Sequence, residues 1–381
     1  MNNSNQFILG ELSRFLSDSL PKEGHYPYSF QNKELTDINQ WREKAYSLFE
    51  ECIAAPHFKV PKVELVELIE FDGLHIEKLR WALPFGPATE AYFIRPIKHT
   101  SPLRGVLGLH DHGLNKVLGK SKLVKIEGNP PLHIRNYQDE MYNSHAWANE
   151  IAKRGFAVLV HDVFPFESRR VQVKDIPPHV VNHLMERSCE VKDEDYKYHE
   201  LAHYMESLIA KSIFTAGFTW PGITLAEDRV ALQILANRKE VDKERIGCCG
   251  ISLGGLRTAY LSPHNDLIKC AVSAGFMTSW NDFIENKAHC HTWMYTIPTI
   301  STHMDFSDII SMMAPKPLLV LSCKDDELFT LSEVNKAEEN LKAIYKKMNK
   351  SDHLSYIYEA GGHRLTKDMQ QVAQLWLEKW L

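Results

Sequence analysis

Three residue types that together make a nucleophile reactive occur in order in the second half of the chain. Ser252 lies in a Gly-x-Ser-x-Gly segment at 250–254, an acidic turn with Asp325 and Asp326 follows, and His363 comes later, after two glycines. A serine hydroxyl attacks a carbonyl carbon readily only when a histidine takes its proton and a carboxylate orients that histidine. We therefore predict a catalytic triad of Ser252, His363 and one of the two aspartates.

Each of these groups follows a predicted strand. The apolar residues 246–249 run directly into Gly-x-Ser-x-Gly, a pattern typical of the nucleophile elbow, in which a strand turns sharply into a helix. The apolar run 317–322 precedes the acidic turn, and residues 354–358, rich in β-forming side chains, precede His363. In a parallel sheet the carboxyl ends of strands share one edge, so we expect the three groups to meet there.

The orienting carboxylate is predicted to be Asp326. An acid in this kind of loop is usually followed by one variable residue and then two apolar ones, and Leu328 and Phe329 fit that spacing. Asp325 is the alternative.

An acyl-transfer site also needs backbone amides directed at the negative oxygen of the tetrahedral intermediate. One donor is expected to be the amide of Leu253, directly after the nucleophile. The second is expected from the loop after the apolar strand 104–109. If His110 and Asp111 replace the usual His-Gly pair, the donor is the amide of His112, which we favour; if His112 and Gly113 are that pair, it is Leu114.

The chain resembles the α/β-hydrolase superfamily, and within it the branch of dienelactone hydrolases and acetyl xylan esterase-like serine esterases. The resemblance covers about residues 90–381 and is carried by five segments: 110–116, 154–162, 241–247, 250–255 and 314–320. It implies a mostly parallel sheet of about eight strands with helices on both faces, and a serine hydrolase that uses Ser252, Asp326 and His363. Asp111 departs from the glycine of many relatives, and dienelactone hydrolases proper use cysteine where this chain has Ser252.

The organisation is predicted as a helical N-terminal extension over residues 1–58 and an α/β-hydrolase domain over 59–381. The extension is expected to pack on the core, shape the entrance or mediate homodimer formation. Two lid-like insertions, at about 164–221 and 276–306, fit the core pattern poorly. Their aromatic and methionine content suits an apolar substrate group. The residues expected to line the substrate pocket are His110, Trp280, Trp293, Met294 and Tyr295.

Composition agrees with one large soluble domain. The chain has 381 residues, of which 44% are hydrophobic, and a formal charge of -5, which gives no reason to expect nucleic acid as a partner. The first residues have neither a basic start nor a long apolar run, so we expect no signal peptide, no membrane association and a cytoplasmic location. Seven cysteines, several of them in predicted core strands, do not suggest structural disulfides.

Other charged and histidine clusters are expected to be structural. His110 with His112 and His289 with His291 make tempting metal pairs, but neither has an obvious third ligand, so no metal and no cofactor is expected.

Two acidic positions are predicted to hold the core together. Asp162 is expected to form an internal ion pair with Arg169 or Arg170 that pins the loop after its strand. Asp228 is expected to anchor the helix before the elbow.

The predicted function is hydrolysis of a carboxylic ester of a small or medium-sized molecule through an acyl-enzyme. The triad itself does not separate esters from amides, so an amidase or peptidase is one alternative. A hydrolase of carbon–carbon bonds is another, because the same fold supports that chemistry. An alternative of a different class is a non-catalytic ligand-binding protein that has kept the fold.

Overall fold

A nine-stranded sheet forms the centre of the computed structural model, with the strand order β1-β2-β3-β5-β4-β6-β7-β8-β9. The structure describes residues 7–22, 24–32, 37–99, 102–185, 194–263 and 265–381. The strands are β1 (Glu64–Phe71), β2 (Leu74–Trp81), β3 (Thr89–Pro96), β4 (Leu103–Leu109), β5 (Phe156–His161), β6 (Val241–Ile251), β7 (Ile268–Ala274), β8 (Leu318–Cys323) and β9 (Leu354–Glu359). From β5 through β9 all neighbouring strands are parallel.

The first three strands are antiparallel to their neighbours. The β1–β2 turn at Asp72 and Gly73 has positive φ at both residues, as a tight hairpin turn requires. The sheet is therefore mostly parallel, as predicted, and has one strand more than the expected eight.

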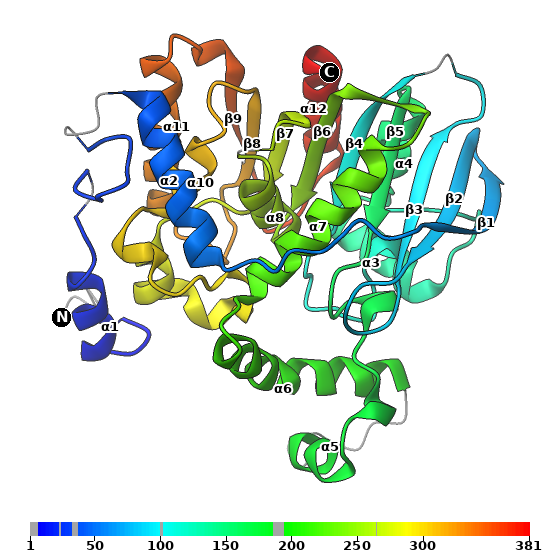
Figure 1. Cartoon of the computed structure of the whole chain (residues 1–381), viewed down its shortest axis with the longest axis horizontal. Helices are drawn as coiled ribbons and strands as arrows, with labels where there is room; N and C mark the ends of the chain where they lie inside the picture. Colours follow the sequence, from blue (N-terminus) through cyan, green and yellow to red (C-terminus); the bar gives the residue numbers. More distant parts are fainter. Residues whose placement is uncertain (1–6, 23, 33–36, 100–101, 186–193, 264) are drawn as a thin grey trace.

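Helices cover both faces of the sheet (Figure 1). They are α1 (Glu11–Asp18), α2 (Ile38–Ile53), α3 (Leu132–Tyr142), α4 (Trp147–Lys153), α5 (Pro178–Met185), α6 (Glu194–Thr215), α7 (Trp220–Ala236), α8 (Leu253–Leu261), α9 (Trp280–Asp282), α10 (Phe306–Ser311), α11 (Leu331–Lys347) and α12 (Lys367–Trp380). One hydrophobic cluster joins α2, α7, α8, α10 and α11 to one face, and a second joins α4 and α12 to the other. This is the α/β-hydrolase architecture.

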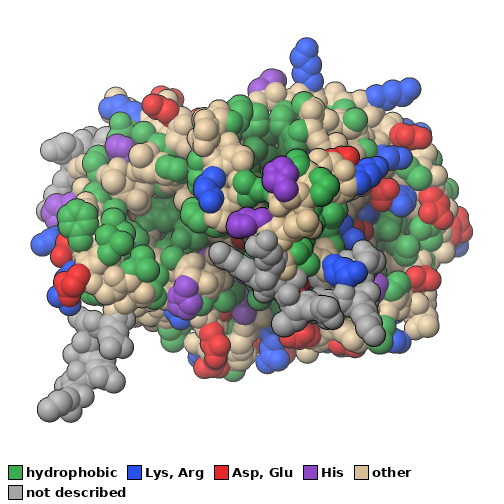
Figure 2. Space-filling model, turned by 90° about the horizontal axis from the view of Figure 1, so that it is seen from below, with side chains coloured by type: hydrophobic (Ala, Val, Ile, Leu, Met, Phe, Trp, Pro, Cys, Tyr) green, Lys and Arg blue, Asp and Glu red, His purple; other side chains and the backbone are tan. Residues whose placement is uncertain are grey.

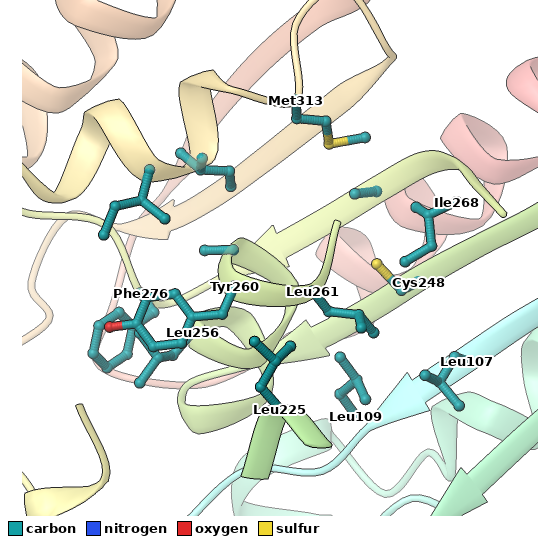
Figure 3. Close-up of a cluster of buried hydrophobic side chains, with 14 of the residues drawn as sticks. Leu107, Leu109, Leu225, Cys248, Leu256, Tyr260, Leu261, Ile268, Phe276 and Met313 are labelled. Atoms are coloured by element: carbon teal, nitrogen blue, oxygen red, sulfur yellow. The ribbon is translucent and has the colours of Figure 1, made fainter. Parts of the chain in front are cut away.

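The helix that directly follows Ser252 is buried on all sides. Every residue of α8 is buried, and Leu256, Tyr260 and Leu261 pack between β4, β6 and β7 on one side and α7 on the other (Figure 3). Such dense packing leaves the first turn of α8 little freedom to move.

The two predicted insertions, 164–221 and 276–306, both contribute side chains to the hydrophobic core, among them Phe166 and Trp280. The first contains α5 and α6, which lie below the sheet in Figure 1, and the second contains α9 and several short helical turns. The sequence of residues 192–218 predicts one long helix, and the structure has α6 at Glu194–Thr215; residues 192–193 lie outside the described residues. Figure 2 views the molecule from this side. Hydrophobic side chains are visible at the end where α1 lies, and exposed residues of that helix include Leu12 and Phe15.

The N-terminal segment is continuous with the core. The side chains of α2 that are buried are Trp41, Ala45, Phe49 and Ile53. Phe49 lies 5.7 Å from Tyr260 of α8, measured between ring centroids. At the far end of α2, the Thr219 hydroxyl donates to the carbonyl of Ile53.

Candidate active site

Ser252 occupies the sharp turn between β6 and α8. Its backbone has φ 57° and ψ -123°, a conformation that a residue with a side chain rarely adopts, and its amide donates to the Ala274 carbonyl at 2.9 Å. Strain of this kind costs about 1–3 kcal/mol and persists where the surroundings enforce it. The predicted nucleophile elbow is therefore present in the geometry.

The glycines around the serine are required by close backbone contacts. A Cβ on Gly250 would lie 2.5 Å from backbone atoms of Gly254, and a Cβ on Gly254 would lie 2.0 Å from the Leu109 carbonyl oxygen. A Cβ on Gly255 would lie 2.4 Å from the Ala274 carbonyl oxygen. The motif thus lets the first turn of α8 touch both neighbouring strands, β4 and β7.

His363 and Asp326 form a hydrogen-bonded pair next to this turn. The His363 Nδ1 atom lies 2.6 Å from Asp326 Oδ2, and the side chains are 16% and 6% exposed. The His363 ring lies against Gly275, where a Cβ would be 3.1 Å from Cε1. Gly275 directly follows Ala274, the backbone partner of Ser252. The His363 Nε2 atom is buried and has no hydrogen-bond partner within the described residues, so this nitrogen is the one left for a proton transfer.

Asp325, the alternative acid, has a different contact. Its Oδ2 accepts from the amide of Gly361 at 2.8 Å, which fixes the glycine loop that carries the histidine. The Asp326 Oδ1 accepts from the Leu328 amide at 3.0 Å. The structure therefore brings His363 together with Asp326, and Asp325 only supports the loop.

The loop predicted to complete the oxyanion hole follows β4, and its Asp111 forms a buried ion pair with Lys122. Asp111 and Lys122 are both fully buried, with Nζ 3.5 Å from Asp111 Oδ2. The hydroxyls of Tyr137 and Tyr142 also donate to the Asp111 carboxylate. Burial lowers the pKa of Lys122, and the Asp111 carboxylate opposes this. The Asp111 carboxylate, which stands where many relatives have glycine, therefore has its charge and its hydrogen bonds satisfied within the protein.

The two histidines of this loop are internal. His110 is fully buried, and burial, reinforced by Arg257 and Lys122, holds its pKa well below the usual value. His112 Nε2 lies 3.0 Å from Glu206 Oε1, and burial, together with Lys116, lowers its pKa to about 4. The His110 side chain, predicted to contact substrate, therefore lies behind the loop and acts as part of its support.

A cavity of about 630 Å³ opens beside the same loop. Its lining residues come from the loop, from α3 and from α6: Gly113, Leu114, Asn115, Val117, His133, Tyr137, Glu140, Met141, Asp195 and His199. The residues of α3 were not expected from the sequence, because a short helix with mixed polarity gives no signal of a binding wall. The volume is within the range of small-molecule sites.

The predicted pocket residues of the second insertion are placed elsewhere. Trp280 and Met294 are buried in the core cluster, and the Trp280 indole donates to the Met304 carbonyl at 2.9 Å. Tyr295 stacks on Phe283 with ring centroids 4.3 Å apart. Trp293 is partly exposed and lies near Phe214 of α6. None of these four side chains, and no residue of the proposed triad, lines the 630 Å³ cavity, whereas Met294 lines a smaller pocket together with Leu253 and Tyr260.

Two further charge clusters connect separate elements of the fold. Asp228 binds Arg257 at 2.7 Å and His161 at 3.0 Å, so it anchors α7 to α8 and β5, as predicted. The prediction that Asp162 pairs with Arg169 or Arg170 is wrong.

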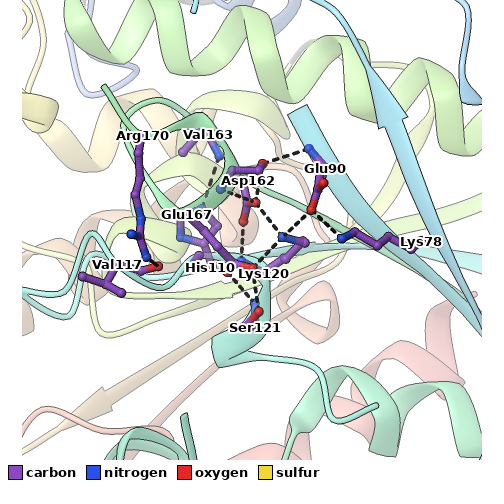
Figure 4. A network of polar contacts seen from close by, with 12 residues as sticks. Lys78, Glu90, His110, Val117, Lys120, Ser121, Asp162, Val163, Glu167 and Arg170 are labelled. Atoms are coloured by element: carbon purple, nitrogen blue, oxygen red, sulfur yellow. Dashed lines mark hydrogen bonds and ion pairs between the residues drawn. The ribbon is translucent and has the colours of Figure 1, made fainter. Parts of the chain in front are cut away.

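Asp162 instead binds Lys120 at 2.9 Å, in a network that also contains Glu167 and Ser121 (Figure 4). Arg169 forms an ion pair with Glu227 at 2.7 Å, and Arg170 forms one with Asp195 at 3.0 Å. The two arginines therefore join the loop to α7 and α6 rather than to Asp162.

Among the described residues, no group of three His, Cys, Asp or Glu side chains is arranged to hold a metal ion. His291 Nε2 lies 2.9 Å from the Leu328 carbonyl, and His289 contacts Cys290. Within the same residues, no helix combines the length and apolar character needed to cross a membrane.

Comparison with known proteins agrees with this geometry. Residues 221–380, which contain the whole proposed triad, match the Prolyl oligopeptidase family. A Bacillus subtilis (strain 168) protein, candidate hydrolase YtaP, is 27% identical over 340 residues, covering 89% of this chain and 99% of that protein.

Two solved structures show the same fold at low identity. A candidate acetyl xylan esterase from Bacteroides fragilis has a TM-score of 0.68 and 15% identity, covering 94% of this chain and 84% of its own. A glucuronoyl esterase from Solibacter usitatus has a TM-score of 0.57 and 13% identity, covering 90% and 94%. The chain therefore has the α/β-hydrolase fold, and its residues 221–380 are similar to the Prolyl oligopeptidase family.

Proposed function

We propose that this protein is a serine esterase that cleaves a carboxylic ester of a small or medium-sized molecule. The observation that carries the proposal is the His363 ring. It is bound to Asp326 through Nδ1, lies against Gly275 next to the backbone partner of Ser252, and has Nε2 without a hydrogen-bond partner among the described residues. In a triad the base must have one nitrogen oriented by a carboxylate and the other available to the nucleophile. The esterases among the solved structures of the same fold support an ester as substrate.

The reaction follows two steps. His363 Nε2 takes the proton from the Ser252 hydroxyl, and the serine oxygen attacks the ester carbonyl. The amides of Leu253 and His112 donate to the oxygen that becomes negative, and the protonated histidine then gives its proton to the leaving alcohol. Water, deprotonated by the same histidine, releases the acid and restores the serine.

The test uses the serine itself. With p-nitrophenyl acetate as substrate, Ser252→Ala should reduce kcat by at least about 10⁴-fold, because removing any member of such a triad leaves only binding and oxyanion stabilisation. A fluorophosphonate probe should label the native protein at Ser252 and leave the variant unlabelled. Ordinary turnover by the variant, or no labelling of the native protein, would overturn the proposal.

A peptidase or amidase is the second candidate, favoured by the match of residues 221–380 to the Prolyl oligopeptidase family. The proposed triad can serve either bond, so the leaving group decides. Rates on an acetyl ester and on the corresponding anilide, measured with the same enzyme preparation, separate the two. A kcat/KM for the anilide equal to or above that for the ester would replace the esterase with an amidase.

A further inference from the structure

Lys122 makes an unusual set of contacts behind the loop that follows β4. It belongs to the short helical turn Lys120–Lys122 and is fully buried. Its Nζ atom donates to the backbone carbonyl of Asp111 at 2.9 Å and to that of His112 at 2.8 Å. One buried ammonium group therefore holds two consecutive peptide units.

These contacts fix the directions of the His112 and Gly113 amide N–H groups. The peptide bonds of this loop are trans, since the cis bonds of the described chain are at Pro165 and Pro315. In a planar trans peptide the C=O and the following N–H point in opposite directions. The Asp111 carbonyl points at Lys122, so the His112 N–H points away from it, and the Gly113 N–H likewise points away from Lys122.

Neighbouring contacts hold the same loop against the elbow. The His110 ring accepts from the Val163 amide through Nε2, so its Nδ1–H donates to the Asp111 carbonyl, at 2.9 Å. Arg257 of α8 donates to the His110 carbonyl at 3.0 Å. The Leu109 carbonyl lies so close to Gly254 that a Cβ there would be 2.0 Å from it. The loop therefore has fixed carbonyl directions and touches the first turn of α8.

We propose that Lys122 is a positioning residue of the oxyanion hole: it holds the Asp111 and His112 carbonyls so that the His112 amide faces the oxygen that becomes negative. Asp111 is its counter-ion, and the hydroxyls of Tyr137 and Tyr142 keep that carboxylate in place. This inference rests on the proposed esterase function, because it assigns a role within the same reaction.

The primary test is Lys122→Met, which keeps the length of the side chain and removes the donor. Loss of one aligned oxyanion donor lowers kcat by about 10²–10³-fold. We expect that loss on p-nitrophenyl acetate, with KM changed less than about threefold because the ground state gains little from the amide. Affinity for phenylboronic acid, which forms a tetrahedral adduct with an active serine, should fall in proportion to kcat rather than to KM.

Lys120→Met is the matched control. Lys120 lies in the same turn, is equally buried, and binds the carboxylates of Asp162 and Glu167 but no carbonyl of the loop after β4 (Figure 4). Both variants break a buried ion pair, so both should lower the melting temperature. Only Lys122→Met should lose kcat and boronate affinity; equal kcat values for the two folded variants would overturn the proposal.

A double variant keeps the test valid if Lys122→Met alone does not fold. Asp111→Asn/Lys122→Met removes both charges of the pair and leaves no buried charge without a partner, which is tolerated far better than breaking one side. It should show the same 10²–10³-fold loss in kcat, and a kcat within threefold of wild type would overturn the inference. Full activity in Ser252→Ala would instead overturn the esterase proposal itself, so the two failures are distinct.

Discussion

The Asp228–His161 and Asp326–His363 pairs differ, and only the second has the arrangement of a catalytic base. His161 binds Asp228 through Nε2 at 3.0 Å, and His363 binds Asp326 through Nδ1 at 2.6 Å. The first carboxylate is shared with the Arg257 guanidinium, and the His161 side chain is fully buried. The second carboxylate has no cationic partner other than the histidine among the described residues. An acid beside a histidine is thus insufficient. His161 Nδ1 and His363 Nε2 both lack a hydrogen-bond partner among the described residues, but only the Asp326 carboxylate is free of a competing cation.

The largest expected difference between the pairs is in catalysis. His363→Gln should lower kcat on p-nitrophenyl acetate by at least about 10⁴-fold, because no other group can take the serine proton. His161→Gln should change kcat of the folded protein less than tenfold. Steady-state kinetics on both purified variants, with circular dichroism to confirm folding, make the comparison. Similar losses for the two variants would contradict the assignment.

The carboxylate of the proposed catalytic pair is expected to give the next largest effect. Asp326→Asn keeps the side-chain shape but no longer favours the histidine tautomer with the proton on Nδ1, and kcat should fall by about 10³–10⁴-fold. Asp325→Asn is the neighbouring control, since Asp325 only accepts from the Gly361 amide. Its kcat should stay within about fivefold of wild type, in line with one hydrogen bond of about 1 kcal/mol. A larger loss for Asp325→Asn than for Asp326→Asn would exchange their roles.

Stability should respond in the opposite order. Asp228→Asn leaves the buried Arg257 without its counter-ion, which costs about 3–5 kcal/mol of unfolding free energy. Asp326→Asn removes no partner from a buried guanidinium, so its melting temperature should fall much less. Urea unfolding followed by tryptophan fluorescence measures both. An Asp228→Asn protein as stable as wild type would show that Asp228 does not anchor α7 to α8.

The smallest expected effect concerns pH. Burial lowers the pKa of His161, although Asp228 opposes this, so the folded state keeps this ring neutral where an unfolded chain would protonate it. A histidine in the unfolded chain titrates at about pH 6.5. The stabilisation from neutral His161 is therefore complete above that pH and is lost as the pH falls toward the lower pKa of the folded state.

The advantage of wild type over His161→Gln in unfolding free energy should therefore shrink between pH 7 and pH 5. The change is limited to about 1.4 kcal/mol per pH unit for one proton. A difference that does not vary with pH would contradict a neutral buried His161.

Local patterns and their order predicted much of the site. The elbow around Ser252 could be predicted from Gly250 and Gly254, because only glycine allows the close backbone contacts seen there. Strand endings before Asp326 and His363 also follow from the alternation of apolar runs. The choice of Asp326 over Asp325 depended on one spacing, and the hydrogen bond to His363 agrees with it.

The interior ion pairs could not be predicted in the same way. Asp162 and Arg169 are close in the chain, yet their partners are Lys120 and Glu227, which only the packing of α7 and of the turn at 120–122 brings near. Three lysines lie within seven residues, at 116, 120 and 122. In the structure all three are buried, because carboxylates and carbonyls from distant segments surround them.

The hydrogen bond between Thr219 and the Ile53 carbonyl has a consequence for how the chain can be shortened. Gly222 lies so close to the same carbonyl that a Cβ there would be 2.2 Å from it, and the start of α7 is thus seated on the end of α2. Removing the first 58 residues would expose the apolar surface beneath α2 and leave Tyr260 of α8 without Phe49. The amino-terminal segment and the catalytic domain are therefore expected to melt as one cooperative unit, and proteolysis between them should inactivate the enzyme rather than release a smaller working hydrolase.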